Sequence, residues 1–559
     1  MNIKNLLRIP QSKYPVKTIL RWLWQAWRGN RLQAVLNAAL GLLGVAASLL
    51  SVWAVQNAID VASHARGGSL YAAVALMGVF VLCDFGVSIA SVWVRNILGI
   101  KAQNRMQQHM LDRILRSEWR GRDSMHSGDV LNRLELDVRN VVEFLTETMP
   151  NTLSVVALFL GSFFYLFSMD AMLAVVIVIM LPLFMLVSRL YVGRMRSLTR
   201  NVRNCDSRVQ SVLQETIQNR MLIKTLEKDD AMVERLEATQ SELRQNVVRR
   251  TVFSLFSNFV LNFGFAAGYL IAFLWGAVRM YGHTLSFGGM TAFLQLVARI
   301  QGPARNLTKL VPQFVSVLTA AERLMELEEN PLEEQGAPLH ISAEGGVGVR
   351  FDNVDYAYAD GERMIMKNFS FDFTPGSCTA VLGETGTGKT TLVRMILALI
   401  RPDSGRAVIY NGRGESRQLS PLTRCNFVYV PQGNTLLSGT IRDNLRLGNL
   451  SATDEDMLNA LHRACADFVS ELPDGLDTVC SESGGGLSEG QAQRIAIARA
   501  LLRDGSVMLF DEATSSLDPD TERRLLANLL EDRRRTIIFV THRMAVVDYC
   551  DRVLRMERI

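Results

Sequence analysis

The stretch GETGTGKTT, residues 383–391, carries the clearest chemical signal in this sequence. It lies between the apolar runs SCTAVL and LVRMILALI, which gives the strand, turn and helix order of a phosphate-binding P-loop. Its glycines let backbone N–H groups close around phosphate oxygens, its lysine can reach the β- and γ-phosphates, and the next threonine can bind Mg²⁺. The predicted nucleotide-binding residues are Gly383, Glu384, Thr385, Gly386, Thr387, Gly388, Lys389, Thr390 and Thr391.

Two adjacent carboxylates, Asp511 and Glu512, end a second apolar run, VMLFDE. At the end of a buried strand, Asp511 can hold Mg²⁺ through water, and Glu512 can orient or deprotonate a water molecule that attacks a phosphate. Such a pair can also do no more than cap the following helix. Because a P-loop needs a second carboxylate near its metal ion, we favour the catalytic interpretation.

A third candidate is GLSEGQ, residues 486–491, which precedes the helical stretch QAQRIAIARALL. Ser488 is a good N-cap, and Gln491 completes a capping box with it. In isolation, this pattern predicts only a helix start. A capped helix start also presents its remaining backbone donors and its positive dipole end to an anion.

Six long apolar runs dominate the first half of the chain, at about residues 32–58, 70–97, 145–167, 171–191, 252–279 and 288–315. Each is near or above the roughly 20 residues that a helix needs to cross a bilayer. Buried helices of soluble proteins rarely stay apolar for so long. We therefore predict six membrane-spanning helices.

The distribution of basic residues predicts the orientation of these spans. Residues 98–144 hold eight Lys and Arg and residues 192–251 hold twelve, whereas the connection between the first two runs holds only Arg66. The positive-inside rule places both termini and both long loops in the cytosol. The net charge of +5 is spread along membrane-flanking segments, so we expect no nucleic-acid partner.

The N-terminal 31 residues are basic and contain RWLWQAW, which is typical of an interfacial helix and predicts no cleavable signal peptide. The seven cysteines show no CxxC or His-paired spacing, so we expect buried free thiols. Residues 98–144 and 192–251 are rich in helix formers, and we expect the apolar helices to continue through them as long stalks. The helical pattern must reverse near residues 119–129 and 214–222.

The second half of the chain has a different character. A polar passage, ELEENPLEEQGAP, occupies residues 326–338, and from about residue 346 short β-rich runs alternate with helices. Continuous apolar strands of this kind belong to a sheet covered on both faces, which predicts an α/β domain. The predicted segments are an interfacial segment (1–31), a membrane domain (32–325), a linker (326–345) and a nucleotide-binding domain (346–559).

Together these features resemble the ATP-binding cassette (ABC) transporter family, in its exporter arrangement. The resemblance spans nearly the whole chain and implies a multidomain membrane protein, with an all-α six-helix transmembrane domain followed by an α/β P-loop ATPase domain. In this family the signature loop of one subunit faces the P-loop of the other, and two ATP molecules lie between two cassettes. The resemblance therefore implies ATP and Mg²⁺ as cofactors, and Ser488, Gly490 and Gln491 as nucleotide contacts. The usual form is LSGGQ, and we expect the departing Glu489 to point away from the nucleotide.

The resemblance also implies roles for single residues. Tyr358 resembles the aromatic residue that stacks on adenine, although a strand tyrosine is by default only half-buried packing. Gln432 resembles the Q-loop glutamine, which senses Mg²⁺ and the attacking water, so Thr390, Gln432 and Asp511 form the predicted metal set. His542 resembles the switch histidine and Asp518 the loop between the two sites.

Three further segments resemble parts of the family. Glu482 resembles the exporter segment that meets the stalk loops. SGDVLNRLELDV and QETIQNRMLIKTL resemble the two intracellular loops, which makes the reversal points candidate coupling helices. Exporters usually continue further than RVLRMERI, so we make no prediction about dimer contacts from such a tail.

The resulting expectation is ATP-driven export or flipping of a substrate across the cytoplasmic membrane, with Glu512, His542 and Gln432 as catalytic residues. An ATP-gated channel or regulatory protein on the same scaffold is the alternative. The expected partner is a second half-transporter chain, with a homodimer favoured over a heterodimer, in contact with membrane lipid. Asp84, Gln295 and Arg299 lie within predicted spans and either line a substrate cavity or stabilise the bundle, for instance as an Asp84–Arg299 pair. The sequence does not specify the substrate.

Overall fold

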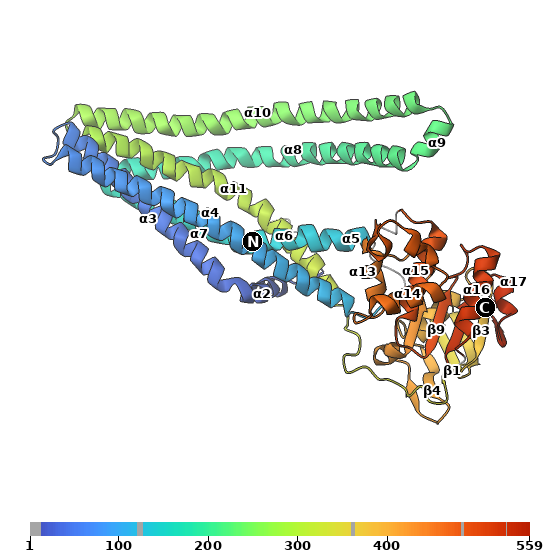
Figure 1. Ribbon diagram of the computed structural model, residues 1–559. Coiled ribbons are helices and arrows are strands. Elements are labelled where there is room, and N and C mark those ends of the chain that lie inside the picture. Colours follow the sequence, from blue (N-terminus) through green and yellow to red (C-terminus); the bar gives the residue numbers. More distant parts are fainter. Residues whose placement is uncertain (1–12, 120–126, 359–363, 482–485, 533, 559) are drawn as a thin grey trace. The chain divides into compact units, whose positions relative to one another are not determined.

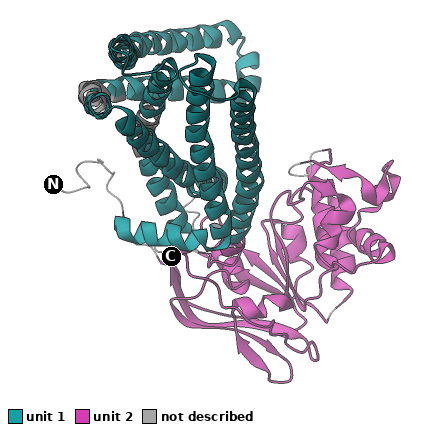
Figure 2. Ribbon diagram, turned by 90° about the vertical axis from the view of Figure 1, so that its left-hand side faces the viewer, with its two compact units in different colours: residues 1–111, 128–327 teal, residues 112–127, 328–559 magenta. Residues whose placement is uncertain are grey.

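The computed structural model describes residues 13–119, 127–358, 364–481, 486–532 and 534–558. The chain forms two compact units: residues 1–111 with 128–327, and residues 112–127 with 328–559 (Figure 2). Each unit is described by itself below. The predicted Glu482 contact, and residues 120–126 of the first reversal point, lie outside the described residues.

The first unit is helical throughout (Figure 1). Its long helices are α2 (Val16–Ala26), α3 (Arg31–Ala62), α4 (Leu70–Leu115), α7 (Met149–Met169), α8 (Ala171–Gln218), α10 (Asp229–Tyr281) and α11 (Phe287–Glu328). Between α4 and α7 lie α5 (Ser127–Asn132), α6 (Val138–Glu143) and two π-helical segments, Arg133–Asp137 and Phe144–Thr148. The short helix α9 (Arg220–Thr225) joins α8 to α10, so the second reversal falls where the sequence predicts it.

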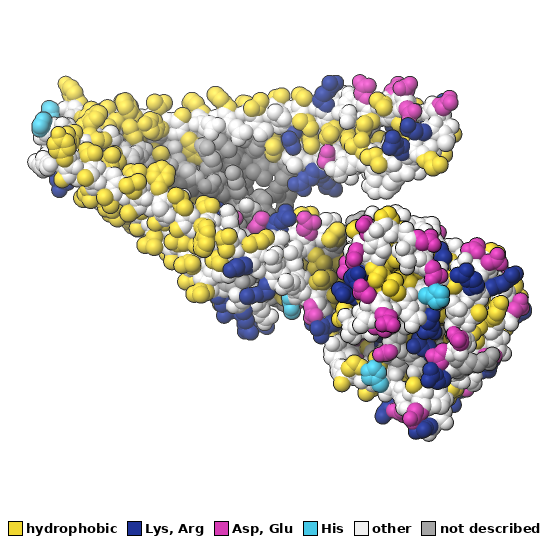
Figure 3. Space-filling model, in the orientation of Figure 1, with side chains coloured by type: hydrophobic (Ala, Val, Ile, Leu, Met, Phe, Trp, Pro, Cys, Tyr) yellow, Lys and Arg dark blue, Asp and Glu magenta, His cyan; other side chains and the backbone are white. Residues whose placement is uncertain are grey.

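Four segments of the described chain are long and apolar enough to cross a membrane: Arg31–Ala62, Leu70–Leu115, Gly128–Met169 and Asp229–Tyr281. The expected fourth and sixth spans fall on α8 and α11. The predicted stalks are confirmed, because α4, α8 and α10 continue unbroken beyond their apolar parts; the 53 residues of α10 correspond to a length of about 80 Å. Apolar side chains cover the bundle surface, and charged side chains gather near α9 (Figure 3).

Polar contacts fix the ends of the membrane helices. The carboxylate of Asp60 on α3 accepts a hydrogen bond from the backbone N–H of Gly288 at 3.0 Å, at the start of α11. Asp170 caps the N-terminus of α8, accepts a hydrogen bond from Trp275 Nε1 at 3.0 Å, and pairs with Arg279 at the same distance. Because helices in lipid gain little from apolar burial against one another, such contacts help to set their register.

The second unit is an α/β domain built on two main sheets. A parallel sheet has the order β11-β3-β10-β9-β6, and an antiparallel sheet has the order β2-β1-β4-β5. The parallel strands are β3 (Cys378–Leu382), β6 (Phe427–Val430), β9 (Val507–Asp511), β10 (Thr536–Val540) and β11 (Arg552–Arg555); the others are β1 (Val347–Ala357), β2 (Met364–Phe373), β4 (Ser404–Asn411) and β5 (Ser416–Gln418). A third sheet pairs β7 (Gly439–Thr440) with β8 (Val479–Cys480).

Two apolar clusters make the core of this unit, and β9 contributes to both because its successive side chains face opposite sides. The helices are α12 (Lys389–Ile396), α13 (Ile441–Arg446), α14 (Asp454–Arg463), α15 (Glu489–Leu501), α16 (Pro519–Leu530) and α17 (Met544–Val547). The predicted helical half followed by an α/β half is confirmed. The seven cysteines are free thiols. The expectation that all are buried is wrong for Cys83, which is exposed on α4, and for Cys425 and Cys550, which are half-buried.

The end of α4 is joined to the segment that the sequence marks as a polar linker. Ser117 forms a β-bridge with Leu332, and the Glu118 N–H donates to the Pro331 carbonyl at 2.9 Å. Glu333 in turn accepts a two-pronged pair of hydrogen bonds from Arg424, at 2.9 and 3.0 Å. The start of the first intracellular loop therefore belongs to the second unit.

Candidate nucleotide site

Four chemically active segments follow the carboxyl ends of four neighbouring parallel strands. The P-loop follows β3, Asp511 ends β9, and His542 and Gln432 lie just beyond β10 and β6. The carboxyl ends of parallel strands share one edge of the sheet, so four segments far apart in the sequence meet there. This edge is where ligands bind in doubly wound α/β folds.

The P-loop backbone depends on its glycines. Gly386 and Gly388 have φ angles of +86° and +98°, which side chains rarely adopt, and Gly388 is the N-cap of α12. At Gly383 a side chain would come within 2.6 Å of the Met556 carbonyl oxygen. Thr387 closes the turn with a hydrogen bond to the Glu384 carbonyl at 2.8 Å. The turn therefore leads directly into the N-terminus of α12, where backbone N–H groups can bind a phosphate.

Lys389 lies beneath this turn with its ammonium group held by main-chain oxygens. The side chain is buried, and its Nζ donates to the carbonyls of Gly383 and Glu384. Burial lowers the pKa of Lys389, and the nearby carboxylates of Glu512 and Asp511 act in the opposite direction. A charge so placed has few competing water contacts and is suited to a polyanion.

Asp511 and Thr390 supply oxygen atoms suited to Mg²⁺. Burial raises the pKa of the Asp511 carboxyl, and the Tyr429 hydroxyl donates to it at 3.3 Å. The Thr390 hydroxyl lies at the exposed start of α12. Among the described residues no group of three or more His, Cys, Asp or Glu is arranged to hold a metal. The oxygen atoms of Asp511 and Thr390 are the kind of donor that Mg²⁺ uses, since this ion commonly binds proteins through one or two side-chain oxygens together with substrate phosphates and water.

Glu512 adopts a backbone conformation that is rare for any residue other than glycine. Its φ angle is +49°, and its N–H donates to the Val540 carbonyl at 2.8 Å. Its carboxylate accepts a hydrogen bond from Gln432 Nε2 at 2.6 Å and lies 3.0 Å from His542 Nε2. Such conformations cost about 1–3 kcal/mol and persist where surrounding contacts fix them, often at functional sites.

His542 lies between a carboxylate and an ammonium group. Its Nε2 atom is 3.0 Å from Glu512 Oε1 and 3.3 Å from Lys389 Nζ. An ammonium group only donates hydrogen bonds and a carboxylate only accepts them. Nε2 therefore donates to Glu512 when it carries a proton and accepts from Lys389 when it does not. The imidazole is half exposed, so a ligand that enters the site can reach Nε2 and replace one of these two partners.

Tyr358 follows β1 and is tied to the P-loop helix. Its hydroxyl lies 3.1 Å from Thr391 Oγ1 and accepts a hydrogen bond from Arg394 at 3.1 Å. The Arg394 guanidinium lies 5.7 Å from the ring centre of Trp119, beyond the end of α4. Tyr358 also packs edge-on against Tyr356, with ring centres 5.1 Å apart. The sequence analysis did not identify Arg394 as a functional residue. The one feature that could have marked it is its charge within the otherwise apolar stretch LVRMILALI.

The predicted capping box of α15 is confirmed. The Gln491 N–H donates to Ser488 Oγ at 3.2 Å, and the Ser488 N–H donates to the Gln491 side-chain oxygen at 2.9 Å. A side chain at Gly490 would come within 2.8 Å of the Ser516 carbonyl oxygen, so glycine allows the two segments to touch. Glu489 is exposed, and Asp518 caps α16 through the Thr521 N–H at 2.9 Å.

Another residue that the sequence analysis missed connects α15 to Glu512, at the edge of the parallel sheet. Gln493 is buried, and its Nε2 donates to the backbone carbonyl of Glu512 at 3.3 Å. The structure thus joins Gln432, Glu512, His542 and Lys389, each in contact with the next. Ser488 and Gln491 contact each other instead.

The structure places the three polar residues predicted within the spans on two helices. Arg299 on α11 donates to Ser51 Oγ at 3.5 Å, and Gln295 lies one helical turn before it and is half-buried. Asp84 on α4 is exposed and lines a cavity. Among the described residues Asp84 and Arg299 form no ion pair, so the expected pairing stays a prediction.

Comparison with known proteins agrees with this architecture. Residues 35–304 match the family model of the ABC transporter transmembrane region, and residues 366–515 match that of the ABC transporter ATPase domain. The ATP-dependent lipid A-core flippase of Bordetella avium is 27% identical over 542 residues, covering 95% of this chain and 90% of that protein. The ABC transporter ATP-binding protein y4gM of Sinorhizobium fredii, itself uncharacterized, is 32% identical over 506 residues, covering 86% of this chain and 83% of that protein.

A solved structure shows the same fold. A bacterial Atm1-family ABC exporter with ATP bound aligns with a TM-score of 0.74 at 22% identity, over 94% of this chain and 93% of that one. Helical membrane domain and ATPase domain therefore occur in the same order along both chains. This chain belongs to the ABC transporter family, as an exporter-type half-transporter that couples ATP hydrolysis to transport across a membrane.

Proposed function

We propose that this protein is a homodimeric, Mg²⁺-dependent ATP-driven pump of the cytoplasmic membrane that exports or flips an amphipathic substrate. Its membrane domain spans residues 32–325, and a linker over residues 326–345 leads to the nucleotide-binding domain over residues 346–559. The observation that carries the proposal is the contact of Glu512 with both Gln432 and His542, next to Lys389 of the P-loop. A structural carboxylate would need neither the rare backbone conformation nor the exposed polar partners.

Each residue of this group has a chemical role in the proposal. Lys389 and the N–H groups of the P-loop bind and orient the phosphates of ATP. Glu512 accepts a proton from the attacking water, and Gln432 and His542 hold its carboxylate in position. The Nε2–H group of His542 donates to Glu512 in this structure and would donate to the γ-phosphate when ATP is bound. Tyr358 stacks on the adenine.

The Thr390 hydroxyl, the Asp511 carboxylate and the Gln432 side chain would hold Mg²⁺. The ion would neutralise phosphate charge and polarise the phosphoryl group.

Half-transporters of this family function as dimers. We propose a homodimer because the chain carries a full catalytic set together with its own signature segment. Ser488, Gly490 and Gln491 would then contact ATP held by the second copy, at the positively polarised N-terminus of α15. The exposed carboxylate of Glu489 is free to turn away from the phosphates.

Two observations support an amphipathic substrate. The relative from Bordetella avium is named as a flippase for lipid A-core, and this chain matches it along most of its length. The membrane helices also combine exposed apolar surfaces with polar side chains on α4, such as Asp84 and Arg95. A substrate with both polar and apolar parts matches both kinds of surface.

The test is the ATPase rate of the chain expressed alone in lipid nanodiscs, beside the Glu512→Gln variant. The variant keeps the shape of the site and should still bind ATP, but it lacks the base, so we expect a fall of about 10²-fold or more. Removing Mg²⁺ with a chelator should abolish the wild-type rate. A variant as active as the wild type would refute the assigned base, and an inactive but folded wild-type protein would refute the homodimer.

A further inference from the structure

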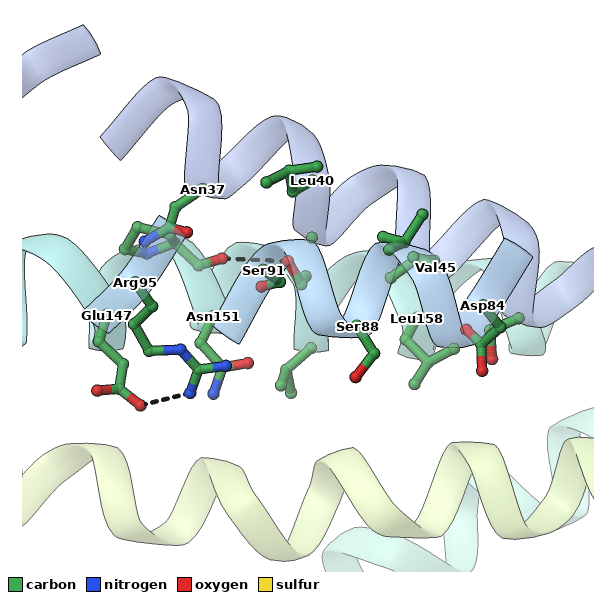
Figure 4. A pocket seen from close by; sticks show the side chains of 17 residues that line it. Asn37, Leu40, Val45, Asp84, Ser88, Ser91, Arg95, Glu147, Asn151 and Leu158 are labelled. Atoms are coloured by element: carbon green, nitrogen blue, oxygen red, sulfur yellow. Dashed lines mark hydrogen bonds and ion pairs between the residues drawn. The ribbon is translucent and has the colours of Figure 1, made fainter. Parts of the chain in front are cut away.

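The membrane part of α4 carries a polar stripe. Asp84, Ser88, Ser91 and Arg95 follow one another at intervals of four, three and four residues, which places all four on one face of the helix. At 1.5 Å per residue the stripe is about 16 Å long. All four residues line one cavity of about 460 Å³ between α3, α4 and α7, which we call the polar slot (Figure 4).

The two helices opposite α4 present small or polar side chains at the same spacing. Asn37, Gly41 and Gly44 on α3 line the slot, as do Asn151 and Ser154 on α7. A side chain at Gly41 would come within 2.0 Å of Ser154 Oγ, so the glycine is what allows α3 and α7 to approach here. The slot therefore combines hydroxyl and carboxamide groups with apolar side chains such as Leu40, Val87 and Leu158.

Several polar groups in the slot are not satisfied within the protein. Among the described residues, Asp84, Ser88, Ser91 and Asn151 have no hydrogen bond from their side chains to another residue. Asn37 is only 8% exposed and donates to the Thr146 carbonyl at 2.8 Å, but its side-chain oxygen has no partner. Unsatisfied polar groups at membrane depth are costly, so they indicate water or a ligand.

The slot carries no surplus positive charge. Arg95 pairs with Glu147 at 2.8 Å at one end, and at the other end the exposed carboxylate of Asp84 forms no ion pair among the described residues (Figure 4). The other polar groups left to bind a ligand are hydroxyls and carboxamides, which both donate and accept hydrogen bonds, and the Asp84 carboxylate can accept from a ligand hydroxyl. A phosphate would need surplus positive charge, and a quaternary ammonium group would need aromatic faces, which the described lining lacks.

We propose that the polar slot binds the neutral, hydroxyl-rich headgroup of a lipid, such as a sugar or another polyol, and that this lipid is the transported substrate. The inference rests on the proposed export function and names its substrate class. A polyol supplies a donor and an acceptor at each hydroxyl, which matches the serines and asparagines of the stripe. The acyl chains remain among the exposed apolar side chains of α4, for example Phe85 and Ile89.

The experiment is an ATP-dependent flipping assay in proteoliposomes, with three fluorescent lipids that share acyl chains: a glucosyl diacylglycerol, a phosphatidylcholine and a phosphatidic acid. Accessibility to a membrane-impermeant quencher reports movement, and Glu512→Gln gives the background. We expect the glucosyl lipid to move at least about tenfold faster than either phospholipid. Equal rates, or a preference for a phospholipid, would overturn the inference while leaving the export function intact. The proposed export function itself would be contradicted only if none of the three lipids moves.

Variants of the slot provide a second test. Replacing both Ser88 and Ser91 by alanine removes two hydrogen-bonding groups, so the concentration of glucosyl lipid for half-maximal transport should rise about tenfold. The matched control is Ser168→Ala, an exposed serine of α7 outside the slot. An unchanged half-maximal concentration in the double variant would overturn the proposal.

A charge variant separates recognition by hydroxyls from recognition by charge. Asp84→Asn removes a negative charge from the lining of the slot, so the slot becomes less repulsive to an anion. We expect transport of the phosphatidic acid to increase severalfold relative to that of the glucosyl lipid. If this ratio does not change, Asp84 does not face the substrate and the assigned slot is wrong.

Discussion

At the scale of single residues, chemistry in the second unit depends on side chains that hold other side chains in place. Arg394 is the clearest case, because it donates to the Tyr358 hydroxyl and lies over the ring of Trp119. Tyr358, the proposed adenine-stacking residue, is thereby connected to Trp119, beyond the end of α4, by two side-chain contacts. Buried polar networks of this kind restrict each member to one orientation.

This arrangement predicts that Tyr358→Phe keeps the stacking ring but loses its orientation. The variant cannot bond Thr391 or Arg394, so we expect the KM for ATP to rise about threefold to tenfold while kcat changes little. Steady-state ATPase kinetics in nanodiscs measure both quantities.

The control is Tyr410→Phe, which removes a comparable hydrogen bond to Asp372, of 2.6 Å, in the antiparallel sheet. It should lower stability by about 1 kcal/mol without affecting KM. If both variants raise KM equally, the effect reflects general loosening of the domain and the positioning role of the Tyr358 hydroxyl is refuted.

At the scale of elements, the same local motif has different uses in one domain. Capping boxes begin α13, α14 and α15, at Thr440, Thr453 and Ser488. The local geometry of the three is alike, since each cap accepts a hydrogen bond from the third helical N–H. Only the α15 cap lies next to a glycine that contacts the Asp518 loop, through the Ser516 carbonyl. A role for Ser488 beyond capping therefore depends on the segments near the N-terminus of α15, because the cap geometry is the same in all three helices.

We expect Ser488→Ala and Thr453→Ala to cost similar stability, about 1 kcal/mol each, because each removes one cap. Only Ser488→Ala should lower the ATPase rate, by about tenfold or more, because its hydroxyl would contact the nucleotide of the second copy. Thermal unfolding and ATPase assays on the same preparations compare the two effects. Equal ATPase rates in the two variants would reduce Ser488 to a helix cap.

The sequence was sufficient where one short segment carries the whole signal. The P-loop, the Ser488 capping box and the helical stalks all rest on local spacing, and the structure has each of them. Contacts such as Gln493 to Glu512, or Arg394 to Trp119, join residues that no local pattern relates. The left-handed conformation of Glu512 was also not predictable, because it is imposed by neighbouring strands.

At the scale of the whole molecule, the turn between the two stalks α8 and α10 exposes apolar side chains that a protein surface in water usually buries. At the turn between the stalks, Met221 and Leu222 of α9 are 84% and 55% exposed, and α9 has no buried residue. The neighbouring stalk ends are charged, which indicates an aqueous environment for this turn. Apolar side chains exposed to water at a helix tip are suited to docking against another protein surface. We infer that α9 transmits motion by docking onto a cassette of the dimer.

Replacing Met221 and Leu222 together by serine should uncouple hydrolysis from transport. Burial of each side chain is worth about 1.5–3 kcal/mol, so losing both should weaken docking by more than tenfold. ATP-dependent substrate flipping should fall accordingly, while basal ATPase activity persists because the catalytic edge is intact. Leu450→Ser is the matched control, since Leu450 is also 84% exposed but lies between α13 and α14. Full transport per ATP in the α9 variant would show that coupling runs through another part of the chain.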